Sequence, residues 1–135
     1  MVTYLCSRTG KFMVFNDEGV FQFTASTIDN TPPPDVRARK SGNITYYVRE
    51  PDINMNYSGT MDDEFLFVLS LVAWERTSTL SIDAYHLENG SYAFSMSVPN
   101  AGDDLPIEIL REGNDFFILY EGHQIIRYEM VSNRV

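Results

Sequence analysis

The two histidines of this chain are the side chains best suited to acid–base or nucleophilic chemistry. His86 follows Asp83 in the segment Leu80-Ser-Ile-Asp-Ala-Tyr-His86, so a nearby serine would complete the residue types of a Ser-His-Asp site. However, the chain has no Gly-x-Ser-x-Gly sequence, the nucleophile turn of many hydrolases. His123 is 37 positions from His86, with no Cys beside it and no HExxH spacing, which is a poor pattern for zinc. We assign no catalytic residue, metal or cofactor from the sequence.

Clustered acids could bind calcium or hydrolyse glycosides. Asp62-Asp63-Glu64 and Asp103-Asp104 are the clearest clusters, and neither follows the Asp-x-Asp-x-Asp-Gly loop of an EF-hand. Glycoside hydrolysis would need two carboxylates that face one cleft. The simpler interpretation is that these acids lie in turns and at sheet edges, where they keep the strands soluble.

Aromatic residues near an arginine suggest a binding site. Trp74 and Arg76, together with Tyr46 and Tyr57, could form a site for a sugar, a peptide or another small molecule. Aromatic rings stack on apolar ring faces, and arginine binds carboxylates. The alternative is that these rings belong to the core.

The elements that would position these residues are strands. Alternating apolar residues bounded by turn residues predict strands over 2–7, 11–16 and 20–26, with turns at Gly10 and Gly19. A second hairpin has Gly90 at its tip, where glycine supplies the positive φ that a tight turn needs. The most apolar run, 65–74, predicts a central strand buried on both faces.

The region between these hairpins is less regular. Three consecutive prolines make 29–35 a stiff connection rather than a strand. The bases of 37–40 are expected in a solvated loop, followed by a strand over 44–49 and a polar stretch to Asp63. No segment shows helical periodicity, so we predict a single all-β domain over 1–135, built from antiparallel meanders.

Two hairpin motifs resemble the blades of TolB-like six-bladed β-propellers. The motifs are Val14-Phe-Asn-Asp-Glu-Gly19 and Ile82-Asp-Ala-Tyr-His-Leu-Glu-Asn-Gly-Ser-Tyr92, and 27–34 is similar to a connection between blades. The resemblance implies roughly three blades and a cell-envelope or periplasmic location. Because a propeller needs at least four blades to close, the open strand edges would pair with missing blades or with a second copy. A β-sandwich or barrel is the alternative fold.

The charge balance limits the choice of partners. With 19 acids against 10 bases, the formal net charge is -9, which disfavours nucleic acids and anionic lipid surfaces. The sequence also lacks a membrane-spanning apolar run and the pattern of a signal peptide. We therefore predict a non-catalytic binding or protein-interaction module. The alternative is part of a propeller-type hydrolase or lyase whose site is completed by missing blades or a partner chain.

Overall fold

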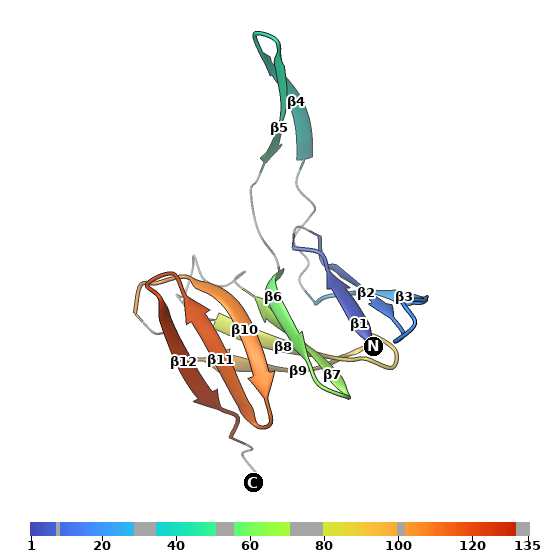
Figure 1. The fold of residues 1–135 in the computed structure, drawn as a ribbon, viewed down its shortest axis with the longest axis vertical. Coiled ribbons are helices and arrows are strands. Elements are labelled where there is room, and N and C mark those ends of the chain that lie inside the picture. The colour runs from blue at the N-terminus through green and yellow to red at the C-terminus, as the bar shows by residue number, and fades with distance from the viewer. Residues whose placement is uncertain (8, 29–34, 51–55, 71–79, 100–101, 132–135) are drawn as a thin grey trace.

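In the part of the chain that the structure describes, twelve strands form four antiparallel sheets (Figure 1). The computed structural model describes residues 1–7, 9–28, 35–50, 56–70, 80–99 and 102–131. The strands are β1 (Val2–Leu5), β2 (Lys11–Phe15), β3 (Phe21–Ser26), β4 (Asp35–Ser41), β5 (Ile44–Glu50), β6 (Asn56–Met61), β7 (Phe65–Ser70), β8 (Leu80–His86), β9 (Tyr92–Val98), β10 (Pro106–Glu112), β11 (Asp115–Tyr120) and β12 (Gln124–Glu129). The sheets have the orders β1-β2-β3, β4-β5, β6-β7-β8-β9 and β10-β11-β12. The predicted all-β, antiparallel fold class is confirmed.

Asparagine and glycine together form the predicted turns. Asn16 Oδ1 accepts hydrogen bonds from the backbone N–H groups two and four positions later, at 3.0 and 2.9 Å, and Gly19 has φ 76°. In the β8–β9 turn, Asn89 Oδ1 accepts the N–H of Ser91 at 2.9 Å, and Gly90 has φ 74°. These side chains satisfy turn donors that strand pairing leaves open, and glycine adopts the left-handed conformation without a Cβ penalty.

One prediction for the middle of the chain was wrong, and one strand there was not predicted. Residues 37–40 form part of strand β4 rather than a loop, and β4 pairs with β5 along its whole length. The polar stretch before Asp63 contains a further strand, β6. Neither strand shows a strong alternation of apolar and polar residues, which is the sequence pattern that predicts a half-buried strand. The predicted Pro-rich connection lies outside the described residues over 29–34, and Asp35 is the first residue of β4.

The four-stranded sheet β6–β9 is the middle layer of the core. Strand β7 is buried on both faces, as predicted for the apolar run 65–74, of which 71–74 lie outside the described residues. On one face, Val68 packs in a cluster with Phe12 from β2. On the other face, Phe67 packs in a second cluster with Phe116 and Ile118 from β11. The three-stranded sheets β1–β3 and β10–β12 therefore cover opposite faces of the β6–β9 sheet.

The first strands of the β6–β9 and β10–β12 sheets lie side by side. The N–H groups of Ile109 and Arg111 in β10 donate to Ser58 Oγ and Thr60 Oγ1 in β6, at 3.2 and 3.1 Å. The residue numbers rise together from one hydrogen bond to the next, in β6 and in β10, so these two strands are parallel. Parallel inner strands are what a rotation between two propeller blades would produce.

Strand β1 has the opposite direction. Thr3, near its start, contacts Met61 at the end of β6, and β1 and β6 point in opposite directions in Figure 1. A simple rotation about one axis cannot relate the β1–β3 sheet to the other two, since it would keep equivalent strands parallel. The arrangement as propeller blades stays a prediction. Among the three packed sheets, only β6–β9 and β10–β12 have parallel first strands, as neighbouring blades would.

Candidate interaction surfaces

The hairpin formed by β4 and β5, residues 35–50, projects away from the three packed sheets (Figure 1). Every side chain from Val36 to Tyr47 is exposed, including large apolar ones. The exposed fractions are 68% for Ile44 and 72% for Tyr47. A two-stranded hairpin without a packed face is only marginally stable in water, because little apolar surface is buried to offset its ordering. This hairpin therefore presents apolar surface that another molecule could cover.

The hairpin has two faces of different composition. In an antiparallel pair, residues directly opposite each other lie on the same face, and the face alternates along each strand. The pairs Arg39–Tyr46 and Arg37–Val48 share one face with Ile44, which we call the Tyr46 face. The pairs Ala38–Tyr47 and Lys40–Thr45 occupy the opposite face. The Tyr46 face thus combines apolar side chains with two guanidinium groups.

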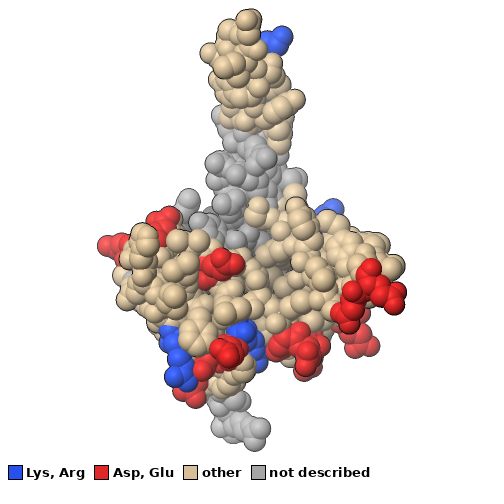
Figure 2. All heavy atoms as spheres, viewed as in Figure 1, with Lys and Arg blue, Asp and Glu red and all other residues tan. Residues whose placement is uncertain are grey.

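The charge of the hairpin is opposite to that of the rest of the chain. Its residues 35–50 contain four bases and two acids, the end residues Asp35 and Glu50, so their formal charge is +2. The remaining residues contain 17 acids and six bases, which gives a formal charge of -11. Figure 2 shows acidic side chains spread over the packed sheets and a basic side chain near the tip of the hairpin. This separation favours contact between the hairpin and an acidic surface.

A second exposed apolar surface lies on the β10–β12 sheet. The inner face of this sheet, with Phe116 and Ile118, packs on the β6–β9 sheet. The face that points away from the β6–β9 sheet, which we call the C-terminal outer face, carries a shallow hollow of about 270 Å³. Its lining residues are Glu108, Ile109, Leu110, Phe117, Leu119 and Ile125. Leu110 and Ile125 are 58% and 67% exposed, so apolar surface lies open here as well.

Acidic residues share the face that carries this hollow. By strand register, Glu112, Asp115 and Glu129 share the C-terminal outer face with the lining residue Glu108. Arg127 is the base on this face, and its Nε donates to Asp115 Oδ2 at 2.8 Å. This ion pair neutralises Asp115 and leaves three glutamates on the same face as the apolar hollow. A partner with an apolar tip and flanking bases would complement this surface.

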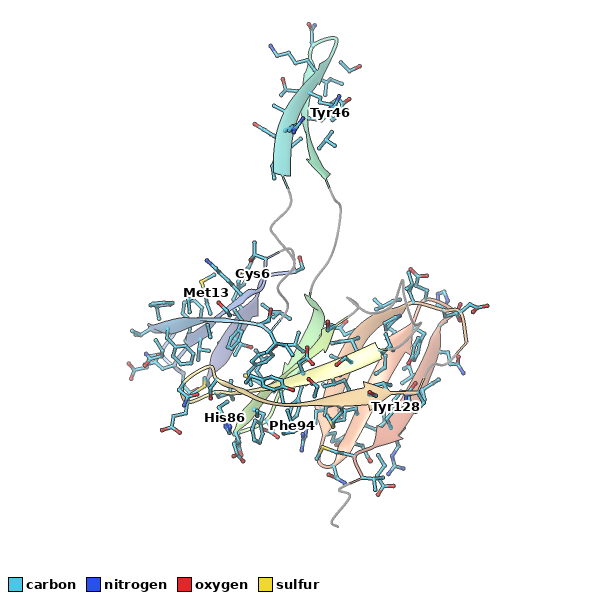
Figure 3. The ribbon with its side chains drawn as sticks, turned by 180° about the vertical axis from the view of Figure 1, so that it is seen from behind. Cys6, Met13, Tyr46, His86, Phe94 and Tyr128 are labelled. Carbon is cyan, nitrogen blue, oxygen red and sulfur yellow. The ribbon has the colours of Figure 1, made fainter. Side chains whose placement is uncertain are left out.

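The structure describes the side chain of only one of the four residues predicted to form a ligand site. Tyr46 lies on the hairpin and is 45% exposed (Figure 3). Tyr57 belongs to β6 in a different sheet, and its side chain lies outside what the structure describes. Trp74 and Arg76 lie within 71–79, also outside the described residues. Their joint site stays a prediction, and the structure adds the hairpin bases and the C-terminal outer face, which sequence reasoning missed.

The candidate Ser-His-Asp residues do not converge. Asp83 accepts hydrogen bonds from Ser81 Oγ at 3.0 Å and Ser95 Oγ at 2.6 Å. The ring of His86 instead packs against Phe65, with 4.9 Å between the ring centroids. Positions 83 and 86 differ by an odd number along β8, so the two side chains point to opposite faces of the sheet. Among the described residues, no group of three or more His, Cys, Asp or Glu side chains could hold a metal ion.

One tyrosine has a clearly shifted pKa, and its surroundings are structural. Burial raises the pKa of Tyr120 above its ordinary value of 10.0, and a 2.7 Å hydrogen bond with the Tyr128 hydroxyl raises it further. Tyr128 OH donates to the carbonyl of Pro99 at 3.2 Å, so Tyr120 supplies the proton between the two phenols. These two hydrogen bonds connect β11 and β12 to the segment that follows β9. It creates no group suited to acid–base catalysis near neutral pH.

Comparison with known proteins gives no family for this chain. No family model matches the sequence, and no curated protein is significantly similar to it. The resemblance to TolB-like propellers is therefore not tested by these comparisons. The described residues also include no helix long and apolar enough to cross a membrane.

Proposed function

We propose that this protein is a non-catalytic interaction module that binds a protein partner through the β4–β5 hairpin. The observation that supports this proposal is the hairpin itself, a projecting element that keeps Ile44, Tyr46 and Tyr47 in solvent. Tyrosine and arginine are enriched among the residues that contribute most to binding at protein interfaces, and the hairpin contains both. Covering its apolar side chains would also stabilise an element that has little support of its own.

The charge of the hairpin defines the chemistry of that partner. Four bases without an intervening acid favour an acidic protein surface over a neutral one. The formal charge of -11 on the rest of the chain would repel a long polyanion, so a nucleic acid is a poorer fit. Pairing through strand edges is the competing predicted route to association, since β3, β9 and β12 each end a sheet in the described structure.

Photo-crosslinking tests this function directly. The photoreactive amino acid benzoylphenylalanine replaces Tyr46 in one variant and Tyr92 in another, in cells that naturally produce the protein. Tyr92 is a matched control, because it is a strand tyrosine with an exposed fraction of 46%, against 45% for Tyr46. We expect a discrete crosslinked protein band from the Tyr46 variant that the Tyr92 variant does not give. Equal labelling from both positions would refute the proposal.

A further inference from the structure

The C-terminal outer face has the composition that the Tyr46 face of the hairpin would recognise. Its centre is apolar, with Leu110 and Ile125 exposed beside the hollow. It also carries acids, since Glu108 lines the hollow and Glu112 lies on the same face. The Tyr46 face has the converse arrangement, in which apolar Tyr46 and Ile44 lie beside basic residues. The two surfaces are therefore complementary in both polarity and charge.

From this complementarity we infer that the β4–β5 hairpin of one copy docks on the C-terminal outer face of a second copy of this chain. The inference rests on the proposed function and names its partner. Tyr46 enters the hollow of about 270 Å³, and Arg39 lies against Glu108, the glutamate that lines it. Each copy has one hairpin and one such face, so two copies can exchange hairpins about a two-fold axis. This reciprocal exchange forms two equal contacts and closes the assembly at a dimer.

A second copy explains both surfaces at once. The hairpin has an excess of bases, and the rest of the chain has an excess of acids. The hairpin of one copy is therefore attracted to the acidic part of the other copy. Two exposed apolar surfaces, on the hairpin and beside the hollow, are covered by the same contact. Burial of apolar surface then supplies affinity, while the charges orient the two copies.

Disulfide trapping between two differently tagged chains tests this arrangement. Both chains carry Cys6→Ser, which removes the single native cysteine. One chain carries Tyr46→Cys and the other carries Ile125→Cys, beside the hollow. In the control, the second chain instead carries Phe21→Cys, which is 53% exposed on the β1–β3 sheet. Under mild oxidation we expect at least about tenfold more mixed disulfide dimer from the Ile125 pair, because docking raises the effective concentration of the two thiols.

Equal yields from the two pairs would overturn the inference. So would a disulfide within one chain when Tyr46→Cys and Ile125→Cys are combined, since the hairpin would then fold back on its own copy. Circular dichroism of each variant verifies that the sheets are formed before oxidation. If Tyr46 photo-crosslinks to a different protein while trapping fails, the proposed function stands and this inference alone is wrong.

Charge reversal gives an independent readout that does not depend on cysteine chemistry. Arg39→Glu should weaken dimerisation by about tenfold or more, and Glu108→Arg in the same chain should restore part of that loss. The measurement is the dimer dissociation constant from analytical ultracentrifugation. Loss without any rescue would contradict the pairing. Binding of duplex DNA by the wild-type protein, abolished by Arg39→Glu, would show that the hairpin recognises phosphate instead and would overturn the inference.

Discussion

Replacing Gly90 by alanine tests how the β1–β3 sheet packs against the β8–β9 turn. Gly90 has φ 74°, and a Cβ at this position would overlap the Cβ of Ala25 and lie 2.9 Å from Phe23 Cε2. The Ala25 Cβ is fixed to the backbone of β3 and cannot rotate away. Alanine at position 90 must therefore push the β1–β3 sheet away from the β6–β9 sheet.

A matched substitution separates this clash from the cost of backbone strain. Gly19 has nearly the same φ, 76°, and nothing lies within 4 Å of a Cβ placed there. Gly19→Ala should cost about 1 kcal/mol of unfolding free energy, the penalty of a left-handed conformation for alanine. Gly90→Ala adds an overpacking cost of about 1–3 kcal/mol, so its total is about 2–4 kcal/mol.

Urea unfolding monitored by circular dichroism gives both values. The expected result is a lower stability for Gly90→Ala than for Gly19→Ala, by about 1–3 kcal/mol. A double variant with Ala25→Gly removes the atom that the new Cβ would meet, and we expect it to recover part of this difference. Equal destabilisation at positions 90 and 19 would refute the described packing of β3 on the turn.

Three further predictions concern the core and its hydrogen bonds. Phe67→Ala should lower the free energy of unfolding, measured in urea, by about 3–5 kcal/mol, because Phe67 is fully buried. Phe21→Ala, on an exposed face, should lower it by under about 1 kcal/mol. Similar losses in the two variants would contradict the assigned faces. Arg111→Met should lower the free energy of unfolding by about 1 kcal/mol. The guanidinium carbon lies 4.4 Å from the Phe67 ring centroid, and Arg111 forms an ion pair with Asp62 at 3.5 Å. An unchanged urea midpoint would contradict both contacts. Burial raises the pKa of Tyr120 in the folded protein, which has no effect on stability while the folded and the unfolded chain both keep the hydroxyl proton. Above pH 10.0 the unfolded chain loses this proton first, so the free energy of unfolding falls as the pH rises. Tyr120→Phe should make this fall shallower between about pH 9 and 11 in urea titrations, and an unchanged slope would argue against burial of that hydroxyl.

Local patterns were sufficient to predict much of the secondary structure. The alternation around Phe12 and Val14 predicted β2, and both side chains are buried on one face. Gly19 and Gly90 marked their turns because a positive φ is a local requirement. The run that begins at Phe65 predicted a strand covered on both sides, and the two adjoining sheets do cover it.

The candidate interaction surfaces could not be predicted in the same way. Strand β4 has bases on both of its faces, so its sequence shows no periodicity that distinguishes an exposed hairpin from a loop. In β11, Phe117 and Phe116 are equally apolar, yet only Phe116 faces the β6–β9 sheet. Which face of a two-sided apolar strand is covered depends on how distant sheets pack. The open face was therefore not visible from the sequence.

Hydrogen–deuterium exchange at two protein concentrations tests the central claim most directly, because it reports on the hairpin and its docking surface together. Exchange is measured well below and well above the dimer dissociation constant. We predict that amides of 36–48 in the hairpin and 117–125 on the C-terminal outer face become more protected together at the higher concentration, while those of β2 stay unchanged. Concentration-independent exchange in both segments would contradict docking between copies, and protection confined to the strand edges β3, β9 or β12 would assign association to those edges instead.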